Sequence, residues 1–201
     1  MTETEKFSPR LPPSRIVLVR HGQTQLEPDD ALRGRLSIPL DKDGREQVRQ
    51  LAEDIKAVQP ELIVCGPLKR ALQTAGAIVE VTAAPMKIDE RLIDRDFGEA
   101  TSMRPQQVIE MWGSIEFAPG VEPMPELRTR ALAAVCQDRG ASPVVIVGHD
   151  VVNRMILHEI SGRDWSEIHQ SVGCWNLIEW SYEKGWEIKA IDMHGPIDEY
   201  L

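Results

Sequence analysis

Residues 16–22 read IVLVRHG, so that four consecutive apolar residues lead directly into an arginine, a histidine and a glycine. A short apolar run that ends at turn residues is typical of a strand buried inside a parallel sheet. Residues 144–149 follow the same plan, because VVIV leads through a glycine into His149. Ligands bind at the carboxyl ends of strands in open α/β sheets, so Arg20, His21 and His149 predict one shared pocket for an anion. Phosphate is the leading candidate.

Short apolar runs alternate with stretches of helical periodicity along the rest of the chain. In residues 44–58, apolar side chains recur at spacings of three and four, which is typical of a helix that lies against a sheet. This alternation predicts an α/β fold, a three-layer α/β/α sandwich around a mostly parallel sheet, and a late hairpin adds an antiparallel edge. The expected strands are residues 16–20, 62–65, 86–88, 144–147, 175–182 and 186–192, and the expected helices are residues 44–58, 68–81, 104–112, 124–136 and 151–160.

The length and composition fit one globular domain. The chain has 201 residues, of which 42% are hydrophobic, and it contains no internal repeat or low-complexity tract. We expect a flexible N-terminal arm at residues 1–14 and a single domain over residues 15–201. The arm lacks the apolar stretch of a secretory signal, and no later segment approaches the ~20 apolar residues of a membrane span. We therefore predict a cytoplasmic protein.

The charge balance and the cysteines bear on partners and cofactors. Acidic residues outnumber basic residues by 32 to 23 and the formal net charge is -9, which argues against nucleic acid or a membrane surface as partner. The three cysteines have no metal-type spacing and are expected to be reduced thiols. The sequence asks for no metal and no other cofactor, and it leaves open whether the chain forms a homodimer.

The residues at the strand ends have the chemistry that phosphoryl transfer requires. That reaction needs a nucleophile, positive charge around the phosphoryl oxygens and a proton for the leaving oxygen. His21 can present a ring nitrogen, and Gly22 lets the substrate approach closely. Arg20 and Arg70 can each contact two phosphate oxygens. A protonated His149 would add a third cationic donor.

Three segments at predicted strand–helix junctions carry these residues: LVRHGQT at residues 18–24, RALQTA at residues 70–75, and VGHD at residues 147–150 with Arg154. In this order they resemble the three motifs of the histidine phosphatase superfamily, in the branch that includes the phosphoglycerate mutases. One such motif would be weak support, whereas three in the family's order are strong. The resemblance frames residues 15–162 and implies a phosphoglycerate mutase-like fold and a catalytic domain.

The resemblance implies a covalent mechanism that uses no metal. His21 would be the nucleophile that attacks phosphorus. Arg20, Arg70 and His149 would hold the equatorial oxygens, and Gly22 would belong to the phosphate site. An acidic residue would protonate the leaving alkoxide and then take a proton from the water that attacks the phosphohistidine, because two successive displacements require the same group as acid and then as base.

Asp94 is the predicted general acid and base. The family carries this group as a glutamate four residues before a glycine, and the corresponding position here holds Asp94. Aspartate is one methylene shorter than glutamate. Either the backbone comes closer to the substrate, or Glu90 or Glu99 takes over the role.

Another position departs from the family's pattern. Glu27 stands where the family usually has an asparagine that aids phosphate binding. A carboxylate there would repel phosphate, so we expect the surrounding loop to be rebuilt, with Arg33 or Arg35 turned inward. Asp150 follows the third-motif histidine, and we expect it to cap the helix that begins there.

Three hypotheses of function follow. The leading hypothesis is a metal-independent phosphatase that hydrolyses phosphate monoesters of small molecules through a phosphohistidine intermediate. The first alternative is a cofactor-dependent phosphoglycerate mutase, although the chain is shorter than such mutases usually are. The second alternative is a non-catalytic phosphate-binding module, which Glu27 and Asp94 motivate. The motifs do not specify the natural substrate, because the loops around the pocket would set it.

Overall fold

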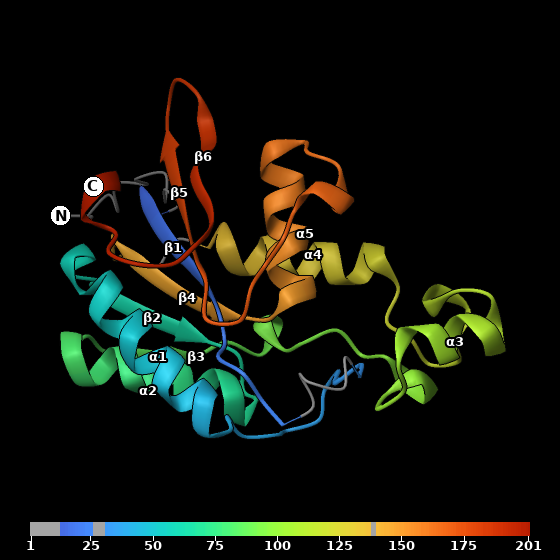
Figure 1. Cartoon of the computed structure of the whole chain (residues 1–201). Coiled ribbons are helices and arrows are strands. Elements are labelled where there is room, and N and C mark those ends of the chain that lie inside the picture. Colours follow the sequence, from blue (N-terminus) through green and yellow to red (C-terminus); the bar gives the residue numbers. More distant parts are fainter. Residues whose placement is uncertain (1–12, 26–30, 138–139) are drawn as a thin grey trace, which may run out of the picture.

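A six-stranded sheet with the strand order β3-β2-β4-β1-β5-β6 forms the centre of the molecule (Figure 1). The computed structural model describes residues 13–25, 31–137 and 140–201, so the expected arm lies almost wholly outside the described residues. The first four strands of that order are parallel, whereas β5 runs antiparallel to β1 and β6 antiparallel to β5. The predicted mostly parallel sheet with an antiparallel edge is confirmed. The strands are β1 (Arg15–Arg20), β2 (Leu62–Cys65), β3 (Met86–Ile88), β4 (Val144–Gly148), β5 (Trp175–Ser181) and β6 (Gly185–Met193).

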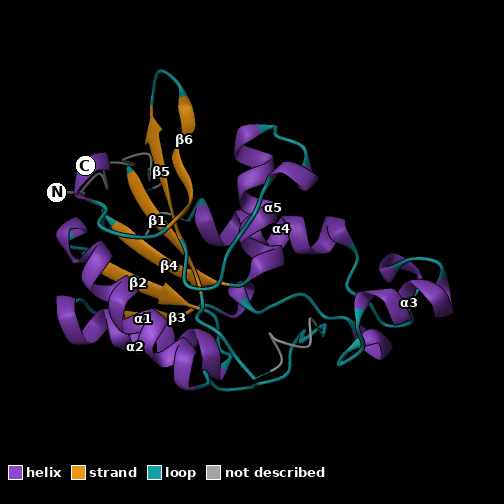
Figure 2. Ribbon diagram, in the orientation of Figure 1, coloured by secondary structure: helices purple, strands orange, loops and turns teal. Residues whose placement is uncertain are grey.

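Helices cover both faces of the sheet, as Figures 1 and 2 show, which confirms the three-layer α/β/α prediction. Along β1, Val17 and Val19 pack into the cluster that α1 and α2 complete. Ile16 and Leu18 point the other way, into the cluster that α4 and α5 complete. This alternation is the period-two pattern of a strand, and both of its faces are buried here. The helices are α1 (Lys42–Ile55), α2 (Lys69–Thr82), α3 (Pro105–Trp112), α4 (Met124–Val135) and α5 (Asp150–Ser161).

A third, smaller cluster lies away from the sheet. Phe97, Ala100, Val108 and Ala118 form its buried part. It belongs to the segment around α3, which Figure 1 shows well apart from β2 and β3. The sequence predicted the helix but not this cluster, because the short 3-10 turns that surround α3 have no hydrophobic periodicity. None of the helices that the structure describes is both long and apolar enough to cross a membrane.

Two glycines bring α1 against the end of β1. A Cβ atom on Gly22 would lie 2.7 Å from the carbonyl oxygen of Gly44 and 2.7 Å from Cγ1 of Val48. A Cβ atom on Gly44 would overlap the carbonyl oxygen of Gln23. We expected Gly22 to let the substrate approach closely. Its Cβ position faces α1 instead, so the close approach that Gly22 allows is that of a helix.

We expect Gly44→Ala to lower the free energy of unfolding by about 1–3 kcal/mol, because the added methyl group displaces backbone at the strand end. Gly76→Ala is the matched control, since Gly76 also lies within a helix, α2, and has no atom within 4 Å of its Cβ position. That variant should gain about 0.5–1 kcal/mol from helix propensity. The urea unfolding midpoints of the two variants, compared with that of the natural sequence at equal m-values, give both changes in the free energy of unfolding. Equal gains for the two variants would contradict the packing argument.

Candidate active site

The three predicted motifs meet at the carboxyl end of the sheet. His21 follows β1, His149 follows β4, and Arg70 lies in the first turn of α2, after β2. The Nε atom of Arg70 lies 3.2 Å from Nε2 of His21 and 3.2 Å from Nδ1 of His149. The two imidazole centroids are 5.2 Å apart. All three side chains are buried, with exposures of 1%, 0% and 0% for His21, Arg70 and His149.

The remaining donors of Arg70 are fixed by loop carbonyls and a carboxylate. Nη1 donates to the carbonyl of Leu36 at 2.6 Å, and Nη2 donates to the carbonyl of Gly34 at 2.8 Å. Nη2 also lies 2.8 Å from Oδ2 of Asp94. Because several N–H groups are bonded at once, the guanidinium has one orientation, with Nε directed between the two histidines.

His21 has the protonation state of a nucleophile. Its Nδ1 lies 2.7 Å from the carbonyl oxygen of Gly22. A carbonyl only accepts hydrogen bonds, so Nδ1 carries the proton and the Nε2 lone pair faces Arg70. Burial lowers the pKa of His21 well below its usual value, and the charges of His149, Arg70 and Arg20 lower it further. A neutral ring with its lone pair aimed into the site can attack phosphorus.

His149 has the tautomer opposite to that of His21. Its Nδ1 accepts from Arg70, so the proton is on Nε2. Nε2 is buried and has no hydrogen-bond partner among the described residues. Burial, followed by the charges of Arg70 and Arg33, lowers the pKa of His149 well below its usual value. The lowered pKa and the contact with Arg70 indicate a neutral ring, so His149 would contribute an N–H donor and not a positive charge.

Arg20 is held by Gln170, which belongs to a network of buried amide side chains. Nη1 of Arg20 donates to the backbone carbonyl of Gln170. The Gln170 side chain donates to Oδ1 of Asn176 at 2.7 Å and accepts from Nδ2 of Asn153 at 3.3 Å. The sequence analysis missed these three residues. Their signal is a polar side chain inside an apolar pattern, since Asn176 lies in β5 and Asn153 on the buried face of α5.

Asp94 is the carboxylate beside the histidines. It is 6% exposed, and Oδ1 accepts from the backbone N–H of Arg95 at 2.9 Å. Oδ2 lies 3.7 Å from Nδ1 of His149. Glu90 and Glu99, the alternatives for the proton donor, are both exposed to solvent. The geometry therefore favours Asp94 among the three.

The expectations for Glu27, for the two loop arginines and for Asp150 have different outcomes. Glu27 lies outside the described residues. Arg33 lines the hollow at the site, as expected for one of the two loop arginines, whereas Arg35 pairs with Asp96 at 3.3 Å. The expectation for Asp150 is wrong: it is the first residue of α5, no side chain caps this helix, and the Asp150 side chain lines the same hollow.

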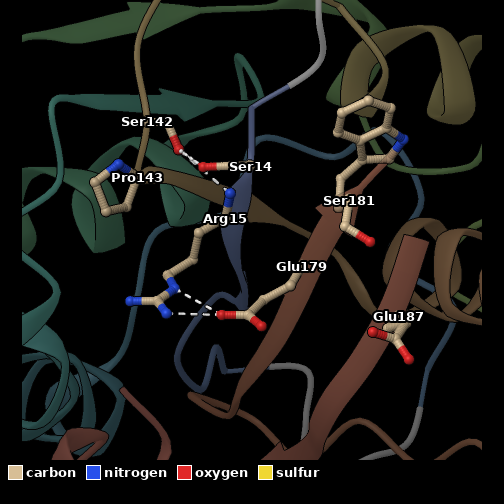
Figure 3. Close-up of a pocket in the computed structure, with 8 residues that line it drawn as sticks. Ser14, Arg15, Ser142, Pro143, Glu179, Ser181 and Glu187 are labelled. Carbon is tan, nitrogen blue, oxygen red and sulfur yellow. Dashed lines mark hydrogen bonds and ion pairs between the residues drawn. The ribbon is translucent and has the colours of Figure 1, made fainter. Parts of the chain in front are cut away.

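That hollow has a volume of about 370 Å³ and is the candidate substrate site. Its residues combine guanidiniums, carboxylates and an apolar wall: Arg20, Ala31, Leu32, Arg33, Asp94, Phe97, Pro105, Asp150, Val151 and Val172. Another hollow, drawn in Figure 3, lies where β1 begins, at the opposite end of the sheet. There Arg15 and Glu179 form an ion pair at 2.7 Å. It is therefore separate from the candidate site.

Comparison with known proteins agrees with this geometry. The model of the histidine phosphatase superfamily (branch 1) matches residues 16–193. The chain belongs to this superfamily. This histidine phosphatase is 30% identical over 192 residues to the uncharacterized phosphatase PhoE of Bacillus subtilis (strain 168), which covers 92% of this chain and 98% of PhoE. It is also 39% identical over 89 residues to a glucosyl-3-phosphoglycerate phosphatase of Mycolicibacterium vanbaalenii, a match to 44% of this chain and 40% of that enzyme.

Solved structures share the fold. YhfR of Bacillus stearothermophilus superimposes with a TM-score of 0.79 at 23% identity, covering 89% of this chain and 96% of YhfR. A mycobacterial glucosyl-3-phosphoglycerate phosphatase in complex with inorganic phosphate superimposes with a TM-score of 0.76 at 24% identity, covering 90% of this chain and 98% of that chain. The predicted phosphoglycerate mutase-like architecture is confirmed.

We expect the stability of this histidine phosphatase to fall as the pH drops below about 6.5, the value for an unperturbed histidine. His21 and His149 have lowered pKa values in the folded state, so the unfolded chain binds more protons there. Each ring contributes a slope of at most about 1.4 kcal/mol per pH unit. Urea unfolding between pH 7.5 and 5 should show a shallower loss for His21→Asn than for the natural sequence. Identical slopes would contradict the burial of a neutral ring.

Proposed function

We propose that this protein is a phosphatase that hydrolyses phosphate monoesters of small molecules through a phosphohistidine on His21. The observation that carries the proposal is the position of the Arg70 Nε atom, 3.2 Å from a ring nitrogen of each histidine. This contact gathers a nucleophile and two donors at one point. Membership in the superfamily and the match to a phosphatase over almost the whole chain support the same activity.

In the first step, the Nε2 lone pair of His21 forms a bond to phosphorus while the ester P–O bond breaks. The electron pair of that bond goes to the leaving oxygen, which takes a proton from Asp94. Arg20, Arg70 and the Nε2–H of His149 hold the phosphoryl oxygens during the transfer. These donors are already oriented by protein contacts, so little reorganisation accompanies the reaction.

In the second step, a water oxygen forms a bond to phosphorus and the N–P bond breaks, with its electron pair returning to Nε2. Asp94 accepts the proton of the attacking water and is ready for another cycle. Inorganic phosphate then leaves. A mutase would instead return the phosphoryl group to a bound acid, and a binding module would stop before the first step.

We expect His21→Ala to lose turnover of p-nitrophenyl phosphate, because no other group takes the nucleophile's place. The natural sequence should release inorganic phosphate in the presence of excess EDTA, and alkaline quenching should trap phosphohistidine, which is stable in base. His194→Ala, which alters an exposed histidine, is the control and should keep full activity. Isomerised phosphoglycerate without free phosphate would indicate a mutase, and loss of activity in EDTA would overturn the metal-free mechanism.

We expect Asp94→Asn to slow hydrolysis of alkyl phosphates by about 10²–10⁴-fold, since it removes the proton donor. Hydrolysis of p-nitrophenyl phosphate should slow much less, because its leaving group hardly needs a proton. Glu99→Gln is the control for a nearby, exposed carboxylate and should leave both rates unchanged. Equal losses on both substrates with Asp94→Asn would assign the proton donor elsewhere.

A further inference from the structure

Asp150 is a carboxylate of the candidate substrate hollow that the mechanism above does not use. It is the first residue of α5 and directly follows His149. Its side chain lines the hollow together with Asp94 and Arg33. It therefore lies next to His149 in sequence and faces the same hollow as Asp94.

The carboxylate of Asp150 has no hydrogen bond and no ion pair within the part of the chain that the structure describes. Two buried carboxylates, those of Asp94 and Glu122, differ in this respect. Asp94 accepts from Arg70 and Arg95, and Glu122 accepts from Arg130 at 2.6 Å. Burial raises the pKa of Asp150, the charges of Arg20 and Arg154 partly oppose this effect, and the charge of Asp94 adds a smaller rise. A partly buried carboxylate that no protein group donates to can accept a hydrogen bond from a group of the substrate.

The other residues of the hollow indicate what kind of donor fits. Arg33 lines the hollow near Asp150, so an ammonium group there would approach a guanidinium. A carboxylate next to the ester would approach Asp150 and Asp94 instead. A hydroxyl group donates to a carboxylate and accepts from a guanidinium at the same time. The apolar wall, which includes Leu32 and Phe97, suits the carbon skeleton of a polyol or sugar.

We infer that Asp150 is a specificity residue that accepts a hydrogen bond from a hydroxyl group on the leaving group, so that the substrates are phosphate monoesters of polyols or sugars. This inference rests on the proposed phosphatase activity. It assigns the phosphate to the arginines of the hollow and the hydroxylated leaving group to Asp150 at the start of α5. Esters with a carboxylate in the leaving group are disfavoured by the same residue.

Three esters of similar size test the inference: glycerol 1-phosphate, n-propyl phosphate and 3-phosphoglycerate. The natural sequence should prefer glycerol 1-phosphate over n-propyl phosphate by about 10- to 100-fold in kcat/KM, the range for a hydrogen bond to a charged group. Asp150→Ala should remove this preference by slowing the glycerol ester while leaving the propyl ester within about threefold. Asp150→Asn, which keeps the shape of the side chain, should raise kcat/KM for 3-phosphoglycerate.

Asp43→Asn is the matched control, because Asp43 is also in the first turn of a helix, α1, but is exposed and does not line the hollow. It should leave the order of the three esters unchanged. A preference for glycerol 1-phosphate that survives Asp150→Ala overturns this inference alone, and so does an equal loss on all three esters. A natural sequence that releases no phosphate from these esters or from p-nitrophenyl phosphate overturns the proposed function and the inference with it.

Discussion

The buried guanidinium of Arg70 is the contact on which the arrangement of the site depends. A charge placed in the interior is costly unless its donors are bonded and an opposite charge lies near it. Arg70 meets both conditions through the carbonyls of Gly34 and Leu36 and the carboxylate of Asp94. The loop before α1, the start of α2 and the segment that carries Asp94 are all held in place by one side chain.

Electrostatics explains why two histidines can stand beside several arginines. Desolvation and the neighbouring guanidiniums both disfavour a charged imidazole, so each ring is neutral at neutral pH. The hydrogen bond from His21 to Gly22 and the contact between Arg70 and His149 then select opposite tautomers. One ring offers a lone pair and the other an N–H group. Positive charge at this site therefore comes from arginine, whose charge is insensitive to pH.

The sequence predicted the sheet well because buried strands and amphipathic helices leave local hydrophobic patterns. β2 and β3 have the expected bounds, Leu62–Cys65 and Met86–Ile88. Helix α1 starts two residues before its expected position, because the side chain of Asp41 caps it by accepting from the N–H of Gly44 at 2.8 Å. The difference at the start of α1 thus has a local cause, the cap formed by one side chain.

The residues of the candidate site could be predicted only where they belong to one of the three motifs. Arg20, His21, Arg70 and His149 stand at strand or helix ends that the hydrophobic pattern already located. Gln170 was not predictable, because its role depends on contacts with Asn153 and Asn176, which come from different elements. The contact between the Cβ position of Gly22 and α1 also depends on tertiary structure, and so does the place of Asp150 in the lining of the hollow. Neither leaves a trace in local periodicity.

The small cluster around Phe97, Ala100 and Val108 packs mainly on itself and on its own segment. Phe97 also lines one wall of the substrate hollow. The rim that touches the leaving group thus has a cluster of its own, which meets one of the two clusters of the sheet at Val151. Substitutions in the rim can accumulate during divergence without disturbing the sheet that carries the histidines. One scaffold can in this way serve different esters while its phosphoryl chemistry stays the same.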